Sequence, residues 1–279
     1  MGHGRLPNFL YIGVARAGST WLYQILREHP QIFVPAAKDI YFFDRHYDKG
    51  LDWYRGFFDG AAGARAVGEL SHDYYESPLV AGRIAGAIPA VKLICCLRDP
   101  REYVLSNYQY SRTTHIGPDV SLAEFCARPD TIHRVDYYGN LKAFFDRFPR
   151  EQIRVLFYDD LRADPLAFAK SVYTFLEVDP EFVAPSTFQR VNPTRTARHE
   201  PLAQLVYRAA QAARRAGLAN AVGWLKHNRL INRVLYAPGA HSVAMPPARL
   251  PDDLVRELRA GLADLEQLLD RTLPEAWYA

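Results

Sequence analysis

The sequence predicts a single α/β domain spanning residues 1–279, with a central parallel β-sheet flanked by helices. One observation behind this prediction is that four short apolar runs are each followed by residues of helical character. Another is the composition, 49% hydrophobic and 23% charged, which is ordinary for a globular chain long enough to bury a large core. Intrinsic disorder is therefore excluded as the main state.

The predicted strands are continuous in apolar character, which is typical of parallel strands buried on both faces. They span Phe9–Val14, Ala66–Leu70, Val91–Leu97 and Ile153–Tyr158. Helices are expected after the first, third and fourth strands, at Ser19–Glu28, Arg101–Tyr110 and Leu166–Leu176. Repeated units of this kind are connected by right-handed crossovers.

The other segments are less regular. The aromatic-rich stretch Pro35–Gly60 predicts a loop and short helix packed over the edge of the sheet, with most of its aromatic side chains in the core. The stretch Ala184–Glu200 predicts a long ordered loop, of the kind that often carries function. After it we expect a helix from Pro201, an apolar and basic stretch around Trp224–Leu235, and a last helix from about Asp252 to Asp270.

The charge of the chain is segregated. The 34 Lys+Arg and 31 Asp+Glu residues give a formal net charge of +3. Seven of the basic residues lie between Pro201 and Pro251, where there is no Asp or Glu, so the remainder carries 27 basic against 31 acidic residues. We interpret residues 201–251 as a basic helical segment with a solvated face, or alternatively as a surface for an anionic acceptor or for peripheral membrane contact.

The cellular setting is predicted from what the sequence lacks. Cys95, Cys96 and Cys126 form neither a disulfide framework nor a CxxC metal motif. The first apolar stretch is too short for a signal peptide, and no run approaches the roughly 20 apolar residues of a transmembrane helix. We therefore expect a soluble cytoplasmic protein with no nucleic-acid partner, and the sequence does not indicate its oligomeric state.

A turn containing two glycines joins the first strand to the first helix, with the sequence Gly13-Val14-Ala15-Arg16-Ala17-Gly18-Ser19-Thr20. Such a turn presents backbone N–H groups and the positive end of a helix dipole to an anion. The lysine of a nucleoside triphosphatase loop is missing, since Ser19 follows the second glycine and the basic residue is Arg16. The third strand ends in Arg98-Asp99-Pro100, where an ATPase would have a metal-binding acid. Both departures indicate two anion sites without an obligatory metal.

These motifs resemble those of the sulfotransferases that use 3′-phosphoadenosine 5′-phosphosulfate (PAPS). Gly13–Leu22 is similar to their 5′-phosphosulfate loop, and Leu97–Tyr108 is similar to their 3′-phosphate motif. Four further stretches resemble the carbohydrate, heparan-type branch and its bacterial relatives, and a fifth resembles the closing segment of the family: His29-Pro30, Lys38–Asp44, Gly50–Tyr54, Gly68-Glu69 and Leu268–Trp277. The resemblance covers nearly the whole chain and implies the sulfotransferase fold, which is similar to that of P-loop NTPases.

The resemblance implies that the loop binds the 5′-phosphate of PAPS. The backbone amides of Ala15–Thr20, including those of Ala17 and Gly18, and the hydroxyls of Ser19 and Thr20 would hold this phosphate. Arg16 occupies the lysine position of the family and would neutralise the charge that grows on the bridging oxygen as the S–O bond breaks.

Arg98 and Ser106 would bind the 3′-phosphate, because an arginine at a strand end and a serine two turns into the next helix can converge on one anion. The alternative for Arg98 is a surface ion pair with Asp99 or Glu102.

Three more residues would contact the nucleotide. Trp21 would stack on the adenine, unless it is a core residue of the first helix. Arg195 and Arg198 match the basic segment that closes over the nucleotide in the family, and the alternative is a solvated basic loop.

The acceptor must lose a proton as it attacks sulfur, so a general base is expected. Asp39 matches the glutamate that the heparan-type enzymes place before their Phe-Phe motif, although a helix cap or an ion pair with Lys38 would also explain it. His72 is the second candidate, with a purely structural role as its alternative, and Glu69 lies on the adjoining strand end. A lysine of that branch falls opposite Leu70 and is missing.

The leading hypothesis is therefore a sulfotransferase that moves a sulfuryl group from PAPS to a hydroxyl or amine and releases adenosine 3′,5′-bisphosphate (PAP), without a required metal. The acceptor would be a carbohydrate, a glycolipid or a small natural product, and fold analogy does not choose among them. Two alternatives remain open: a non-catalytic module that binds PAP or another nucleotide, and an ATP-dependent kinase of the same fold.

Overall fold

The computed structural model describes residues 5–114, 119–189 and 249–278. Within them, parallel strands form a five-stranded sheet in the order β2-β3-β1-β4-β5. The strands are β1 (Phe9–Gly13), β2 (Ile32–Phe33), β3 (Ala66–Leu70), β4 (Lys92–Leu97) and β5 (Ile153–Phe157). The four strands predicted from the sequence are confirmed to within one residue at each end. The short strand β2 was not predicted, because two residues are too few to show a periodicity.

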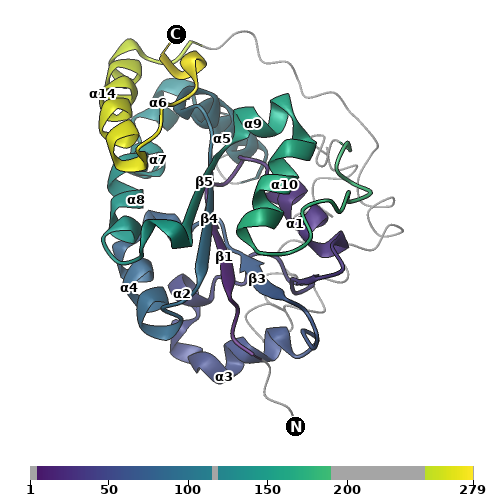
Figure 1. Ribbon diagram of the computed structural model, residues 1–279. Coiled ribbons are helices and arrows are strands. Elements are labelled where there is room, and N and C mark those ends of the chain that lie inside the picture. The colour runs from purple at the N-terminus through teal and green to yellow at the C-terminus, as the bar shows by residue number, and fades with distance from the viewer. Residues whose placement is uncertain (1–4, 115–118, 190–248, 279) are drawn as a thin grey trace.

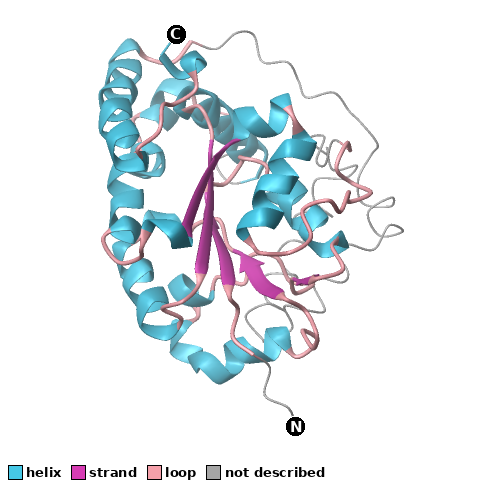
Figure 2. Cartoon of the chain, in the orientation of Figure 1, coloured by secondary structure: helices cyan, strands magenta, loops and turns pink. Residues whose placement is uncertain are grey.

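Helices cover both faces of the sheet (Figure 2). On one side lie α1 (Ser19–Glu28) and α10 (Pro165–Phe175), and on the other lie α4 (Pro78–Ala87), α8 (Tyr137–Phe145) and α14 (Asp252–Leu269) (Figure 1). Every residue of β1 and of β3 is buried, as expected for strands covered on both faces. The predicted helix at Ser19–Glu28 is confirmed, and its apolar stripe, which includes Trp21 and Ile25, is buried.

The remaining described elements connect this framework. They are the helices α2 (Phe42–Arg45), α3 (Gly50–Arg55), α5 (Pro100–Thr114), α6 (Leu122–Cys126), α7 (Pro129–Val135) and α9 (Tyr158–Ala163), and 3-10 turns at Tyr47–Lys49, Gly56–Phe58, Tyr74–Glu76, Arg150–Gln152 and Glu275–Tyr278. The segment Pro35–Gly60 therefore contains short helices, and Phe42, Phe43 and Tyr54 within it are buried in the core, as predicted. The predicted helix after Pro201 and the stretch Trp224–Leu235 lie outside the described residues.

The strand order places one junction where a ligand can bind. From β1 the chain builds β2 and β3 on one side, and it later returns to place β4 on the other side. In open α/β sheets, ligands bind at such a switch point, outside the carboxyl ends of the strands. Arg16, His72 and Arg98 follow the carboxyl ends of β1, β3 and β4, so the fold brings them to the same edge of the sheet.

The structure also bears on the predicted cellular setting. No helix in the described ranges is long and apolar enough to cross a membrane. Cys95, Cys96 and Cys126 are free and buried, and burial raises the pKa of each thiol. The cytoplasmic location stays a prediction.

Gly68 allows β3 to pack closely against β1, so a larger residue at this position should destabilise the fold. A Cβ atom at Gly68 would lie 2.3 Å from the carbonyl oxygen of Phe9, its register partner. We expect Gly68→Ala to lower the free energy of unfolding by about 1–3 kcal/mol. Gly86 in α4 is the control, because a Cβ there meets nothing within 4 Å. Gly86→Ala should raise stability by about 0.5–1 kcal/mol, and equal effects of both substitutions in urea unfolding would contradict the packing described here.

Candidate functional site

The loop after β1 has a backbone that suits anion binding. Gly18 has a φ of 84°, and a Cβ there would lie 2.6 Å from Leu161. A Cβ at Gly13 would lie 2.4 Å from the Tyr75 ring. Arg16 also has a positive φ, of 60°, which is uncommon for a residue other than glycine. No side chain caps the N-terminus of α1, where backbone N–H groups and the helix dipole favour an anion.

Three of the predicted nucleotide ligands are brought together at the switch point. Arg16 Nε donates a hydrogen bond to Ser106 Oγ at 3.3 Å, and Arg98 Nη1 donates to the Arg16 carbonyl oxygen at 3.2 Å. The Arg16 guanidinium packs over the Tyr110 ring at 4.9 Å. Burial lowers the pKa of Arg16, and the neighbouring charge of Arg98 acts in the same direction. Two like charges in a partly buried site would be relieved by an anion bound between them.

Arg98 also forms the ion pair that the sequence suggested as its alternative role. Its Nε and Nη2 atoms lie 3.1 and 2.9 Å from Glu102 Oε2. Glu102 is also paired with Arg162, at 3.0 Å. Burial opposes the ionisation of Glu102, but the hydrogen bonds from the two arginines lower its pKa overall. A phosphate at Arg98 would therefore compete with a carboxylate.

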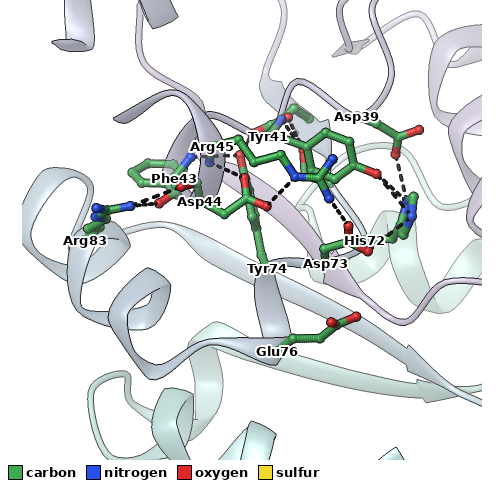
Figure 3. Close-up of polar contacts among 12 residues, drawn as sticks. Asp39, Tyr41, Phe43, Asp44, Arg45, His72, Asp73, Tyr74, Glu76 and Arg83 are labelled. Atoms are coloured by element: carbon green, nitrogen blue, oxygen red, sulfur yellow. Dashed lines mark hydrogen bonds and ion pairs between the residues drawn. The ribbon is translucent and has the colours of Figure 1, made fainter. Parts of the chain in front are cut away.

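The two predicted general bases are in direct contact (Figure 3). His72 Nδ1 lies 2.9 Å from Asp39 Oδ1, and His72 Nε2 lies 3.1 Å from the Tyr41 hydroxyl and 3.3 Å from Asp73 Oδ1. Asp39 and Tyr41 have positive φ angles of 63° and 55°. Strained backbone of this kind is concentrated at functional sites.

Further charged residues lie beside this pair. Arg45 packs over the Tyr41 ring at 3.8 Å and forms ion pairs with Asp73 and Asp44 (Figure 3). Burial raises the pKa of Asp44 to about 6. Burial also raises the pKa of Tyr41 far above its usual range, so its hydroxyl remains a hydrogen-bond donor.

Lys38 is a site residue that sequence reasoning missed as a ligand. Its Nζ donates a hydrogen bond to Ser19 Oγ at 3.1 Å and lies 3.9 Å from Asp39 Oδ1. It therefore joins the loop after β1 to the predicted base. A signal was present in the sequence, because Lys38 directly precedes Asp39 in a chain whose glycine loop lacks a lysine.

Trp21 is largely a core residue. Its side chain is only 6% exposed, its Nε1 donates to the Thr187 carbonyl oxygen at 3.1 Å, and its ring meets that of Phe168 edge-on at 5.8 Å. The next residue after Thr187 is Phe188, which is 71% exposed. An exposed aromatic side chain thus lies one residue beyond the backbone contact of Trp21.

Glu69 supports the site from within the core. Its carboxylate is buried and accepts hydrogen bonds from the hydroxyls of Tyr54, Ser71 and Tyr74 at 2.9, 2.8 and 2.6 Å. Ser71 Oγ in turn accepts the N–H of Tyr41 at 3.0 Å. Burial raises the pKa of Glu69 to about 7, against the effect of these hydrogen bonds. Since its oxygens are bound to core hydroxyls, Glu69 is placed to hold the backbone near Asp39 and not to meet an acceptor.

The other predicted site residues, Arg195 and Arg198, lie outside the described residues. Within the described residues, no group of three or more His, Cys, Asp or Glu side chains is arranged to hold a metal ion.

A comparison with protein families and curated proteins gives consistent matches. A family model described as a sulfotransferase domain matches residues 6–214. The membrane-associated sulfotransferase kil1 of Dictyostelium discoideum is 37% identical over 109 residues, which cover 38% of this chain and 23% of that protein. The human bifunctional heparan sulfate N-deacetylase/N-sulfotransferase 3 is 30% identical over 201 residues, covering 64% of this chain and 23% of that protein. The human heparan sulfate glucosamine 3-O-sulfotransferase 5 is 27% identical over 190 residues, covering 63% and 55%.

These alignments cover between about a quarter and about a half of the length of the curated relatives. Two solved structures are similar to this chain over nearly its whole length. A sulfotransferase from Alicyclobacillus acidocaldarius has a TM-score of 0.70 at 23% identity, covering 99% of this chain and 100% of that one. The sulfotransferase domain from the curacin biosynthetic pathway has a TM-score of 0.53 at 15% identity, covering 97% and 100%. They confirm the predicted fold.

The buried Glu69 makes the stability of the protein depend on pH. An unfolded glutamate titrates near 4.5, whereas burial raises the folded-state pKa of Glu69 to about 7. Between these values the folded state holds more protons, so the free energy of unfolding falls as the pH rises, by on the order of 3 kcal/mol from this group. We expect Glu69→Gln to remove this part of the decline, measured by urea unfolding across the interval.

Burial also raises the pKa of Glu76 to about 7 and that of Asp44 to about 6. These two groups would therefore keep part of the dependence of the free energy of unfolding on pH in the variant. Glu257→Gln is the matched control, since Glu257 is exposed on α14. If the free energy of unfolding of Glu69→Gln fell with pH as steeply as that of the wild type, the raised pKa assigned to Glu69 would be contradicted.

Proposed function

Because the chain belongs to the sulfotransferase family, we propose that it is an enzyme that transfers a sulfuryl group from PAPS to an acceptor hydroxyl or amine and releases PAP. The observation that carries this proposal is the arrangement at the switch point. Arg16, Ser106 and Arg98 form one cationic group, and the loop after β1 links it, through Lys38, to the contact between Asp39 and His72. These contacts support a nucleotide site and a proton acceptor on two sides of one loop.

The nucleotide would be held by its two anionic ends. The amides of Ala17 and Gly18 and the hydroxyls of Ser19 and Thr20 would hold the 5′-phosphate at the N-terminus of α1. Arg98 and Ser106 would hold the 3′-phosphate, with the guanidinium of Arg16 beside them. The residues fit an anion there because burial lowers the pKa of the Arg16 guanidinium and the neighbouring charge of Arg98 acts in the same direction.

The adenine would lie against the exposed ring of Phe188, with the buried Trp21 ring supporting the backbone at Thr187. Arg195 and Arg198 would close over the nucleotide, a proposal that rests on the sequence alone. Three further proposals also rest on the sequence alone. They are a single domain over residues 1–279, a cytoplasmic location, and a surface contact through residues 201–251.

The proposed reaction is an in-line displacement at sulfur. The acceptor oxygen or nitrogen forms a bond to sulfur, and the bond from sulfur to the bridging oxygen breaks, which leaves its electron pair on the 5′-phosphate of PAP. The acceptor proton passes to Asp39. Both ring nitrogens of His72 are already in contact with Asp39, Tyr41 or Asp73, so His72 would orient the Asp39 carboxylate and share its charge.

The acceptor would be a carbohydrate, a glycolipid or a small natural product. Two of the relatives are named for heparan sulfate, which supports a sugar hydroxyl or amine. Incubation with radiolabelled PAPS and a panel of neutral sugars, heparan fragments, glycolipids and phenols tests the proposal. Transfer of label to any class supports it, and absence of PAP binding at millimolar nucleotide would contradict it.

Arg98 should determine affinity for PAP. We expect Arg98→Ala to weaken PAP binding by about 10–100-fold, because a charge-assisted hydrogen bond is worth about 1.5–3 kcal/mol. Calorimetric titration measures the effect. Arg256→Ala is the control, since Arg256 is an exposed arginine on α14. Equal affinities of the two variants for PAP would remove Arg98 from the site.

Asp39 should determine turnover. We expect Asp39→Asn to lower kcat by about 10²–10⁴-fold, the usual contribution of a general base, and to leave PAP affinity within about twofold. His72→Gln should lower kcat less, because it removes only the partner of the carboxylate. A larger loss for His72→Gln than for Asp39→Asn would make His72 the proton acceptor.

A further inference from the structure

A cation is expected beside the departing sulfuryl group, and the contacts of the Arg16 guanidinium are with Ser106 and Tyr110. Breaking the S–O bond leaves negative charge on the bridging oxygen, and a positive group held there lowers the barrier. The Arg16 guanidinium is directed toward Ser106 and Tyr110, on the side of the second anion site. A different cation faces the loop from the acceptor side.

That cation is Lys38. Its Nζ is 3.1 Å from Ser19 Oγ, in the first turn of α1, and 3.9 Å from Asp39 Oδ1. The side chains of Lys38 and Asp39 are each 17% exposed, so the amine is shielded from most of the solvent. Of these two contacts, the one with Ser19 is at hydrogen-bond distance, and the one with Asp39 is a longer ion pair. The ammonium therefore lies between the loop proposed for the 5′-phosphate and the group proposed to accept the acceptor proton.

Two backbone hydrogen bonds hold the segment that carries Lys38. The N–H of Asp39 donates to the Leu70 carbonyl oxygen at 2.9 Å, and the N–H of Tyr41 donates to Ser71 Oγ at 3.0 Å. Both contacts join the segment that carries Lys38 to the carboxyl end of β3. The backbone next to Lys38 is thus held at the end of a strand that pairs with β1, which places the amine within reach of the loop.

We propose that Lys38 is a catalytic residue that binds the sulfuryl group of PAPS. This inference rests on the proposed function. A sulfur atom passing from the 5′-phosphate, near Ser19, to an acceptor beside Asp39 must cross the space that Lys38 borders. The ammonium has three N–H donors, and it would exchange its contact with Ser19 for the sulfuryl and bridging oxygens. As the S–O bond breaks, it stabilises the electron pair left on PAP, while Asp39 takes the proton.

PAPS and PAP distinguish this role, because they differ by the sulfuryl group alone. We expect Lys38→Met to weaken PAPS binding about tenfold or more and PAP binding less than about twofold, both measured by calorimetry without acceptor. With the acceptor found by the labelling panel, kcat should fall by about 10²–10³-fold. Lys38→Gln keeps a donor toward Ser19 and removes the charge, so it should behave similarly.

Lys142→Met is the matched control, because Lys142 pairs with Asp146 on the surface of α8, and it should change neither affinity nor kcat. Equal losses for PAPS and PAP in the Lys38 variants would make Lys38 a phosphate ligand and overturn the inference. Unchanged binding of both nucleotides would reduce Lys38 to an ion-pair partner of Asp39, with the same result. A wild-type protein that binds neither nucleotide would instead contradict the proposed function.

Discussion

The parallel pairing of β1 with β3 on one side and β4 on the other is the constraint on which the site depends. Because the three strands run in the same direction, the segments that leave their carboxyl ends start at one edge of the sheet. One of these segments begins α1, another leads to His72, and the third begins with Arg98. Residues far apart in the sequence therefore meet there, as Arg16 and Ser106 do across 90 positions.

The site also stores backbone strain, and the core beneath it holds that strain in place. Arg16, Asp39 and Tyr41 have left-handed φ angles without being glycine, which costs of order 1–3 kcal/mol each. For Tyr41 the compensation can be traced, since its N–H binds Ser71 Oγ and that hydroxyl donates to the buried Glu69. Glu69 thus supports the Tyr41 backbone through a chain of hydrogen bonds, and its buried carboxylate is the electrostatic cost of that support.

Sequence patterns predicted the framework well because strands buried on both faces are continuous apolar runs. The helix α4 was harder to predict, because its two glycines lower its helix propensity and its packing against α8 holds it in place. The motifs predicted that Arg98 and Ser106 lie near one anion site, and the fold predicted that Arg16 and Arg98 share one edge of the sheet. The direction of the Arg16 side chain and the contact between Lys38 and Ser19 could not be predicted, because each depends on packing between separate segments.

The two arginines at the switch point are neighbours, yet an anion would affect them differently. Arg98 is already paired with Glu102, whose pKa its hydrogen bonds help to lower, so a phosphate there replaces one negative partner with another. Arg16 is held by a neutral hydroxyl and an aromatic ring, and burial lowers its pKa. Among the described residues, the contacts of the Arg16 guanidinium are to these neutral groups, so a bound anion would add a negative partner there. Glu102 and the Arg16 carbonyl oxygen hold the Arg98 guanidinium in place before a ligand arrives, so Arg98 can form a charge-assisted hydrogen bond to a phosphate with little reordering of its side chain.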